Sequence, residues 1–313
     1  MYTEYYGFNE KPFTLTPDPE FLYLSKQHQT ALNMLEYGLH SQAGITVING
    51  EVGSGKTTLV RRILQEVDQT LTVGLISNAH SAFGDLLQWV LNAFEIEAAG
   101  TDKASRYQAF VDFLIKEYSE NRRTVLIIDE AQNLDVQTLE ELRLLSNINA
   151  DKYLLLQLIL IGQPELLEVL RKPELRQLAQ RVSVDYRLNP LKYKESVDYI
   201  RHRLRVAGGS ANLFDKYAIA VVFYYSQGVP RLINTLCDFA LVYGFAEEAD
   251  SIDLALMLDV IKDKIKGGIY PVPEHENKET QKIRELINKE KGVDIAVFVN
   301  EDEDNDEEEL NAL

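Results

Sequence analysis

The stretch INGEVGSGKTTLV, residues 48–60, constrains this chain more than any other part of its sequence. It stands between an apolar run and a helix-like run, and within it Gly50–Thr57 match the pattern G-x-x-x-x-G-K-[ST]. Glycines let backbone N–H groups turn inward and approach phosphate oxygens without a Cβ clash, and the following helix adds the positive end of its dipole. The stretch therefore predicts a loop that binds a polyphosphate.

The residue types of this loop favour ATP with Mg²⁺. Lys56 is expected to reach the β- and γ-phosphates, and Thr57 to ligate Mg²⁺. The alternative is a glycine-rich turn whose lysine faces solvent, but the strand, loop and helix that the motif requires follow in order here. The expected nucleotide-binding residues of the loop are Gly50, Glu51, Val52, Gly53, Ser54, Gly55, Lys56, Thr57 and Thr58.

A second part of the site is expected in TVLIIDEAQ, residues 124–132. Its apolar run leads to Asp129 and Glu130 at the carboxyl end of an expected buried strand, where ligands of open α/β sheets sit. Asp129 is expected to hold Mg²⁺ directly or through water, and Glu130 to orient and polarise an attacking water. The alternative is an Asp-Glu cap on the next helix. Beside the lysine loop, the pair predicts ATP hydrolysis as well as binding.

A third strand-like run, LLLQLILIG, ends at Gly162 and is followed by Gln163. This strand is expected to lie between the first two in the sheet. Gln163 is then a candidate sensor that touches the γ-phosphate or the lytic water. The alternative is that Gln163 only caps the helix-like segment PELLEVL.

The fold class follows from the pattern between residues 45 and 188, where apolar strand-like runs alternate with helix-like segments. Near-continuous β-branched runs suit strands buried on both faces. The pattern predicts an α/β core with a parallel five-stranded sheet and helices on both faces. The expected strands are ITVIN, LTVGLIS, TVLIID, YLLLQLILIG and VSVDYRL.

From Pro190 onwards the strand pattern stops and apolar residues recur at helical spacing. This change predicts a small all-helical lid domain after the core. The expected organisation is a leader at 1–40 packing near the nucleotide, the ATPase core at 41–189, the lid at 190–267, and a charged extension with a disordered acidic tail at 268–313.

Arginines between the third strand and the lid predict a site shared by subunits. Arg176, Arg181 and Arg187 lie there, and an arginine at a subunit edge stabilises transition-state charge on a neighbour's nucleotide. Arg181, just before the last strand, is the best placed, and Arg176 is the alternative. A surface arginine in a solvated ion pair remains open for either. In SQGVPRLIN, Arg231 is expected to project from a first helical turn over the γ-phosphate.

Charge and composition limit the partners and the compartment. Eight acids between Glu301 and Glu309 carry about half of the formal net charge of −17, and an acidic surface matches nucleic acid poorly. The basic cluster Arg201–Arg205 is interpreted as a solvated helix face. The lone Cys237 excludes an intramolecular disulfide and is expected to be a buried apolar residue. Because neither a signal peptide nor a long apolar run is found, a cytoplasmic protein is expected.

Taken together, the motifs resemble those of an AAA+ ATPase of the ExeA/GspA family. The resemblance rests on GEVGSGKTT, LIIDEAQ, LIGQPEL, LRQLAQRV, GVPRLINTLCDFAL and the leader YYGFNEKPFTLTPDPEFLYLSKQH, and covers about residues 1–266. It implies that Gln163 is sensor one, Arg181 the finger and Arg231 sensor two. It also implies that leader aromatics and prolines lie near the adenine. After residue 266 the sequence departs from the better-known members, which continue into a membrane span and a peptidoglycan-binding region.

The expected function is that of an ATPase active as a homo-oligomeric ring or filament, often hexamer-like. It would act on a protein partner in a secretion, pilus or exopolysaccharide assembly system. The first alternative is an ATP-dependent, DNA-binding transposition regulator, TnsC-like or TniB-like, which would need a basic inner surface. The second is a nucleotide-gated adaptor that hydrolyses ATP slowly.

Overall fold

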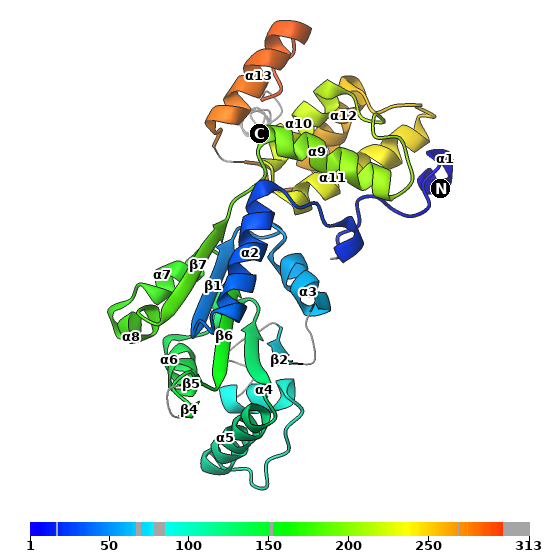
Figure 1. The fold of residues 1–313 in the computed structure, drawn as a ribbon. Coiled ribbons are helices and arrows are strands. Elements are labelled where there is room, and N and C mark those ends of the chain that lie inside the picture. The colour runs from blue at the N-terminus through cyan, green and yellow to red at the C-terminus, as the bar shows by residue number, and fades with distance from the viewer. Residues whose placement is uncertain are drawn as a thin grey trace, which may run out of the picture. The chain divides into compact units, whose positions relative to one another are not determined.

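The computed structural model of the chain describes residues 1–16, 18–66, 70–77, 85–150, 153–267, 269–273 and 275–296 (Figure 1). The chain divides into two compact units. The α/β unit comprises residues 26–52 and 56–189, and the helical unit comprises residues 1–25, 53–55 and 190–313. The predicted acidic tail, Glu301–Glu309, lies outside the described residues.

The α/β unit contains the predicted five-stranded parallel sheet, in the order β2-β3-β6-β1-β7. The prediction that the third run lies between the first two is confirmed, because β6 pairs with β3 on one side and with β1 on the other. The run YLLLQLILIG is divided: Tyr153–Leu154 form β5, which pairs with β4, Asn149–Ala150, in a separate ribbon. The sheet strands are β1 Ile45–Gly50, β2 Leu71–Ile76, β3 Arg123–Ile128, β6 Leu156–Gly162 and β7 Val182–Leu188.

Burial explains why these runs are strands of one sheet. Every residue of β1 and β6 is buried, and all but the first of β3, whereas the edge strands β2 and β7 are only partly buried. Central strands need apolar side chains on both faces, which is the continuous pattern seen in the sequence. The strands with the most continuous apolar runs are therefore the central ones, and the strands with interrupted runs lie at the edges.

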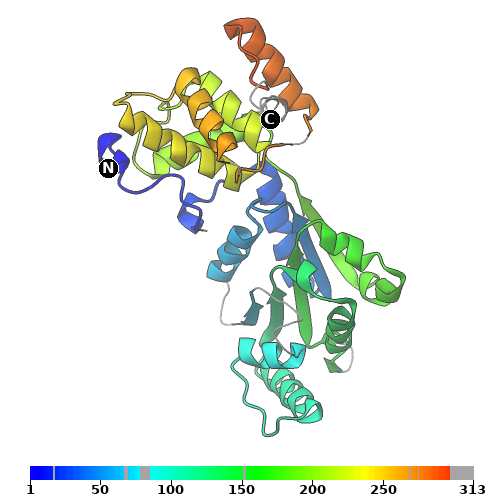
Figure 2. The ribbon, with the colours of Figure 1, turned by 180° about the vertical axis from the view of Figure 1, so that it is seen from behind.

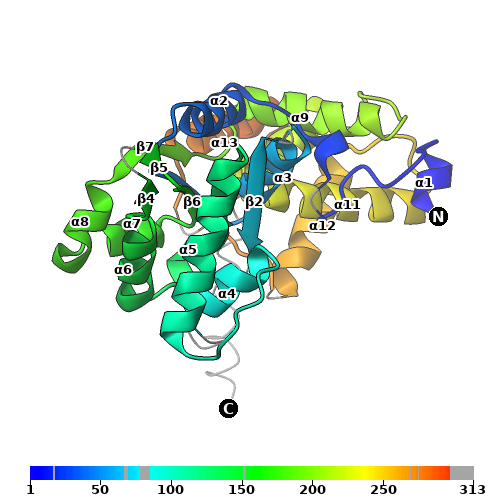
Figure 3. The ribbon, with the colours of Figure 1, turned by 60° about the horizontal axis from the view of Figure 1, so that its bottom comes forward.

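Helices cover both faces of the sheet, as predicted. Two helices pack on one face over Ile48, Ile127 and Ile161, and the others pack on the opposite face over Val47, Leu126 and Leu158 (Figure 3). The first group is α2 Lys26–His40 and α3 Lys56–Glu66; the second is α4 Leu86–Ala93, α5 Lys103–Ser119, α6 Val136–Leu145, α7 Glu165–Leu170 and α8 Arg176–Ala179.

Aspartates begin several helices of both units. The carboxylates of Asp85, Asp102 and Asp135 accept hydrogen bonds from backbone N–H groups two or three residues later, at the starts of α4, α5 and α6. Asp215 and Asp253 do the same for α10 and α12. Such caps satisfy N–H groups that have no partner inside the helix, so these starts are set locally.

The helical unit is built around α10, which is buried at every position from Ala218 to Ser226. A helix without a polar face must be covered on all sides, and here its neighbours supply the cover. The unit's larger helices are α9 Tyr193–Val206, α10 Lys216–Ser226, α11 Pro230–Ala246, α12 Leu254–Lys266 and α13 Lys278–Lys291. Cys237 is fully buried in α11, as predicted.

The helical unit extends beyond the lid boundaries expected at 190 and 267. Ile283, Ile287 and Ile295, all after the expected boundary, belong to the same hydrophobic core as α10 and α11. Figure 2 shows α13, coloured orange-red, next to the other helices of this unit. The leader also belongs to this core, in which four of its aromatic side chains are buried: Tyr2, Phe8, Phe13 and Phe21. Tyr2 lies in α1, Tyr2–Tyr5, and Phe21 ends the 3₁₀ turn η1, Pro19–Phe21.

The position of leader aromatics near the adenine stays a prediction. Burial of these four rings means that they are packing residues of the helical unit, with little ring surface to offer to a base.

One sequence interpretation is wrong for Arg203, which is buried rather than solvated. Its Nε donates to Pro12 O, its Nη1 to Tyr199 Oη at 3.0 Å, and its Nη2 to Thr14 Oγ1 at 3.5 Å. The guanidinium also lies 4.7 Å from the ring centre of Phe21, within cation–π range. The arginine therefore fastens the leader to α9. Of the predicted basic cluster Arg201–Arg205, only Arg205 is exposed.

We predict that Arg203→Met loosens the leader. The substitution keeps the aliphatic volume but removes the donors to Pro12 and Thr14, which should lower the free energy of unfolding by about 1–3 kcal/mol. Amide hydrogen exchange of residues 8–16 should rise at the same time. The control is Arg205→Met on the exposed face of the same helix; equal exchange in the two variants would contradict the role given to Arg203.

Candidate functional site

The predicted phosphate loop follows β1 directly and leads into α3. Gly50 is the last residue of β1 and Lys56 is the first of α3. Between them, Gly53 and Gly55 have φ angles of +77° and +100°, which side chains with a Cβ adopt only with strain. The two glycines thus permit the turn that the motif requires.

Lys56 lies beneath this loop. It is 7% exposed, and its Nζ donates to Gly50 O at 2.7 Å and to Glu51 O at 2.9 Å. Burial lowers the pKa of Lys56, and the nearby carboxylates of Glu130 and Asp129 act in the opposite direction. The two bonds use two of the three donors of the ammonium group, so one donor is left for a phosphate oxygen.

The two predicted magnesium ligands lie side by side. Thr57 Oγ1 donates to Asp129 Oδ2 at 2.8 Å. Asp129 follows β3, is 8% exposed, and its N–H donates to Ile76 O at the end of β2. Among the described residues, no group of three or more His, Cys, Asp or Glu side chains could hold a metal alone. A hydroxyl with one carboxylate fits Mg²⁺, which takes its other oxygen ligands from phosphates and water.

Glu130 is held by two glutamines. Its Oε2 accepts hydrogen bonds from Gln132 Nε2 and from Gln163 Nε2, the latter at 3.1 Å. Gln132 Oε1 in turn accepts the backbone N–H of Gln163 at 3.0 Å. The carboxamide of Gln132 therefore connects the ends of β3 and β6. Glu130 itself has φ +56° and ψ +37°, a left-handed conformation uncommon for a residue with a side chain and frequent at functional sites.

The same contacts show that the side chain of Gln163 does not cap α7, while its role as a sensor stays a prediction. The N-cap of α7 is Pro164, without a side-chain cap, and the Gln163 carboxamide bonds to Glu130. Sequence reasoning missed Gln132 altogether. The available sign was its position two residues after Glu130, on the short turn that follows β3, where a side chain can fold back onto the carboxylate.

Arg181 lies at the other end of the sheet. It immediately precedes β7, whose first residue, Val182, is in register with Ile45 at the start of β1. The strands are parallel, so a strand of this length separates Arg181 from the carboxyl edge by roughly 20 Å. Its Nη1 donates to Ser146 O at 3.4 Å, and Arg181 is exposed. Arg181 therefore cannot reach the phosphate loop of its own chain.

The other predicted arginines are all exposed. Arg176 opens α8. Arg187 lies 3.8 Å from the carboxylate of Glu51. Arg231 follows Pro230 in the first turn of α11, and its N–H donates at 3.2 Å to the carbonyl of Gly53, which is grouped with it in the helical unit.

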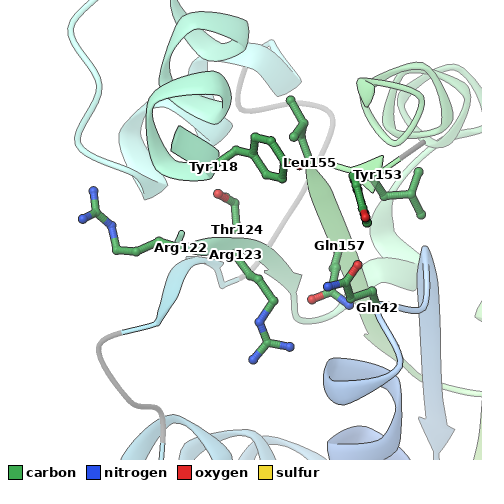
Figure 4. A pocket seen from close by; sticks show the side chains of 9 residues that line it. Gln42, Tyr118, Arg122, Arg123, Thr124, Tyr153, Leu155 and Gln157 are labelled. Carbon is green, nitrogen blue, oxygen red and sulfur yellow. The ribbon is translucent and has the colours of Figure 1, made fainter. Parts of the chain in front are cut away.

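A small pocket of the α/β unit lies at the amino edge of the sheet and is not part of this site. Figure 4 shows Arg123 and Gln157 extending from β3 and β6 among its lining side chains. Arg123 Nη1 donates to Leu39 O at 2.8 Å, and Gln157 Nε2 donates to Gly38 O at 3.2 Å. The last carbonyls of a helix have no partner within the helix, and in α2 these two side chains donate to them. We therefore interpret the two side chains as a structural cap of α2.

Comparisons with known sequences show the family of this chain. A family described as an AAA domain matches residues 39–170. General secretion pathway protein A of Aeromonas hydrophila is 40% identical over 255 residues, which are 80% of this chain and 46% of that protein. The chain thus spans about half the length of this curated relative.

Solved structures share the fold at low identity. The ORC2 protein of Aeropyrum pernix, solved as ADPNP and ADP complexes, matches with a TM-score of 0.60 and 16% identity, over 94% of this chain and 89% of that one. The Cdc6p of Pyrobaculum aerophilum matches with a TM-score of 0.62 and 13% identity, over 93% and 88%. At these identities the likeness shows the fold alone.

The glutamine bridge leads to a prediction for Gln132. Gln132→Ala removes a donor to Glu130 and the link to Gln163, so the carboxylate should lose its fixed direction. ATP turnover should then fall on the order of tenfold, a part of the roughly 10²–10⁴-fold that a positioned base contributes. Steady-state kinetics should show a lower kcat with little change in KM. Asn133→Ala, an exposed neighbour, serves as the control; if both variants keep the wild-type kcat, Gln132 does not position the base.

Proposed function

The chain belongs to the AAA+ ATPase family of general secretion pathway protein A, and from that membership we propose that it binds and hydrolyses Mg-ATP at subunit interfaces. The proposal rests on two hydrogen-bonded pairs of side chains that lie at the same edge of the sheet. Thr57 is bonded to Asp129, and Glu130 is bonded to Gln163. One pair suits a metal–phosphate group and the other an attacking water.

Binding is assigned to the loop and α3. The loop from Gly50 to Gly55 surrounds the phosphates, Lys56 contacts the β- and γ-phosphates, and Thr58 stands next to them in the first turn of α3. Thr57 and Asp129 would hold Mg²⁺, which would supply positive charge beside the phosphate oxygens.

Hydrolysis is assigned to Glu130. Its carboxylate orients a water in line with the γ-phosphate and accepts a proton from it, while the bond from the γ-phosphorus to the bridging oxygen breaks and ADP leaves. Gln132 and Gln163 support this orientation through their bonds to the same oxygen of Glu130. We propose that Gln163, as sensor one, also contacts the γ-phosphate or the water.

A neighbouring subunit completes the site. Arg181 is exposed and a full strand length from its own phosphate loop, which supports a role in trans as the arginine finger. We therefore propose a homo-oligomeric ring or filament as the active form, with Arg176 as the second candidate. Arg231 is proposed as sensor two, so that the helical unit responds to the nucleotide state.

We propose that the conformational change driven by ATP hydrolysis acts on a protein partner. Membership of the general secretion pathway protein A family supports a partner in a secretion, pilus or exopolysaccharide assembly system. A cytoplasmic location is part of the proposal; among the described residues, no helix is long and apolar enough to cross a membrane. The net charge of −17 disfavours the DNA-binding alternative, because duplex phosphates repel an acidic surface.

We expect Glu130→Gln to stop turnover without stopping binding. The amide keeps the size of the side chain but cannot take a proton, so kcat should fall by roughly 10²–10⁴-fold. A fluorescent ATP analogue should bind with an affinity near that of the wild type, and excess EDTA should abolish wild-type hydrolysis. Lys56→Met is the comparison that should lose binding itself. Wild-type protein that neither binds nor hydrolyses ATP with Mg²⁺ would refute the proposed function.

The role in trans is tested by mixing two inactive variants. Arg181→Ala should lower kcat by roughly 10³-fold or more, the range of an arginine finger. In an equal mixture with Glu130→Gln, about a quarter of the interfaces pair an intact Glu130 with an intact Arg181, so activity should return. Arg176→Ala mixed in the same way identifies which arginine is the finger. No recovery with either arginine variant would exclude a shared site.

A further inference from the structure

The last turn of α10 is bound to the C-terminal segment, which we define as the described residues 269–273 and 275–296. Tyr224 Oη donates to the carboxylate of Glu276, and Tyr225 Oη donates to Ile295 O. In the reverse direction, Tyr270 Oη donates to Tyr225 O at 3.2 Å. The contacts connect both ends of the C-terminal segment to one turn of helix.

Gln227, two residues after Tyr225, makes two hydrogen bonds to the C-terminal segment. Its Nε2 donates to His275 O at 2.8 Å, and its Oε1 accepts from Asn277 Nδ2 at 3.1 Å. Gln227 is the C-cap of α10 and has φ +49°, a left-handed conformation. Both ends of its carboxamide are therefore committed to the C-terminal segment, while its backbone reverses the chain toward α11.

The turn that follows leaves little freedom before α11. Gly228 has φ +77°, and a Cβ placed on it would lie 1.9 Å from Leu191 O. Gly228 O accepts the N–H of Leu191 at 2.9 Å, and Val229 N–H donates to Ser226 O at 2.9 Å. Pro230 and Arg231 then form the first turn of α11. Only the three residues of this turn separate Gln227 from Arg231.

The C-terminal segment is itself firmly built. Arg284 of α13 donates through Nε and Nη2 to both oxygens of Asp294, each at 2.6 Å, and lies 3.2 Å from the carboxylate of Glu276. These bonds lower the pKa of Asp294, so the pair stays charged near neutral pH. Ile283 and Ile287 of the same helix are buried in the core of the helical unit. The segment can therefore hold Gln227 in one place.

We propose that Gln227 is a positioning residue through which the C-terminal segment sets the direction of Arg231. This inference rests on the proposed role of Arg231 as sensor two. With the segment in place, the first turn of α11 keeps Arg231 ready for the γ-phosphate. Whatever displaces the segment loosens the turn and weakens hydrolysis, so the C-terminal segment is a regulatory input to the ATPase.

The experiment compares two variants that loosen different contacts of the same segment. Gln227→Glu keeps the shape of the side chain but places a carboxylate oxygen against His275 O. Lys216→Ala is the matched control, because Lys216 contacts Glu290 of α13 at 3.4 Å and lies at the far end of α10 from the turn. Gln227→Asn is the conservative variant: it keeps the amide but is one methylene too short to make both bonds.

Two readouts are used. The first needs no nucleotide: amide hydrogen exchange of residues 228–233 should rise about tenfold in Gln227→Glu, stay at the wild-type rate in Lys216→Ala, and lie between them in Gln227→Asn. The second is kinetic: kcat for ATP should fall about tenfold in Gln227→Glu with KM changed less than threefold, because the contact to Arg231 acts in the transition state. Thermal unfolding of the three variants checks that the unit stays folded.

The outcomes separate this inference from the proposed function. If wild-type protein hydrolyses ATP but Gln227→Glu matches Lys216→Ala in exchange and kcat, the positioning role is overturned. Faster exchange with an unchanged kcat also overturns it, since the turn would then move without affecting the reaction. If the wild type shows no hydrolysis, the proposed function fails instead, and unchanged exchange in Gln227→Glu would overturn the structural half of the inference independently.

Discussion

Parallel alignment of the five strands is the constraint on which the candidate site depends. Because all five run in one direction, the residues that follow β1, β3 and β6 meet at one edge of the sheet. The phosphate loop, Asp129 and Gln163 each follow one of these strands, although they are far apart in the sequence. The residue that precedes β7, Arg181, is placed at the opposite edge by the same rule. The parallel direction of the strands thus gathers the phosphate loop, Asp129 and Gln163 at one edge, and it fits the proposed role of Arg181 in trans.

Hydrogen bonds at this edge join Lys56, Thr57 and Glu130 to other groups of the protein. Lys56 bonds to loop carbonyls, Thr57 bonds to Asp129, and Glu130 bonds to two carboxamides. Buried polar groups without partners are costly, so these bonds stabilise the site as it stands. The proposed binding of Mg-ATP would exchange these partners for phosphate oxygens and water.

The helical unit takes part of its core from both ends of the described chain. Phe13 of the leader and Ile287 of the C-terminal segment are buried in the same core as α10 and α11. Gln227, which follows α10, bonds to residues 275 and 277 of the C-terminal segment. These bonds offer a route by which a region outside the nucleotide site can act on Arg231.

Local patterns were sufficient for much of the fold. Continuous apolar runs identified the five strands, and the motif Gly50–Thr57 predicted the loop after β1 that leads into a helix, where Lys56 and Thr57 begin α3. The position of the third strand between the first two was also predicted and is confirmed. Side chains whose partners are distant in sequence were different: Gln132 was passed over, and Arg203 was interpreted as solvated. Neither residue differs in type or spacing from an ordinary surface residue.

The sequence by itself therefore determined the elements, the parallel α/β core and the residues of the phosphate loop, because these depend on side chains within a few positions of one another. Only the tertiary structure decided that Gln132 bridges Glu130 and Gln163, that Arg203 is buried against Pro12, and that Gln227 is held by the C-terminal segment. The physical reason is that a hydrogen bond between distant segments depends on where folding brings their backbones. That position is set by the packing of whole helices and strands, and no short stretch of residues records it.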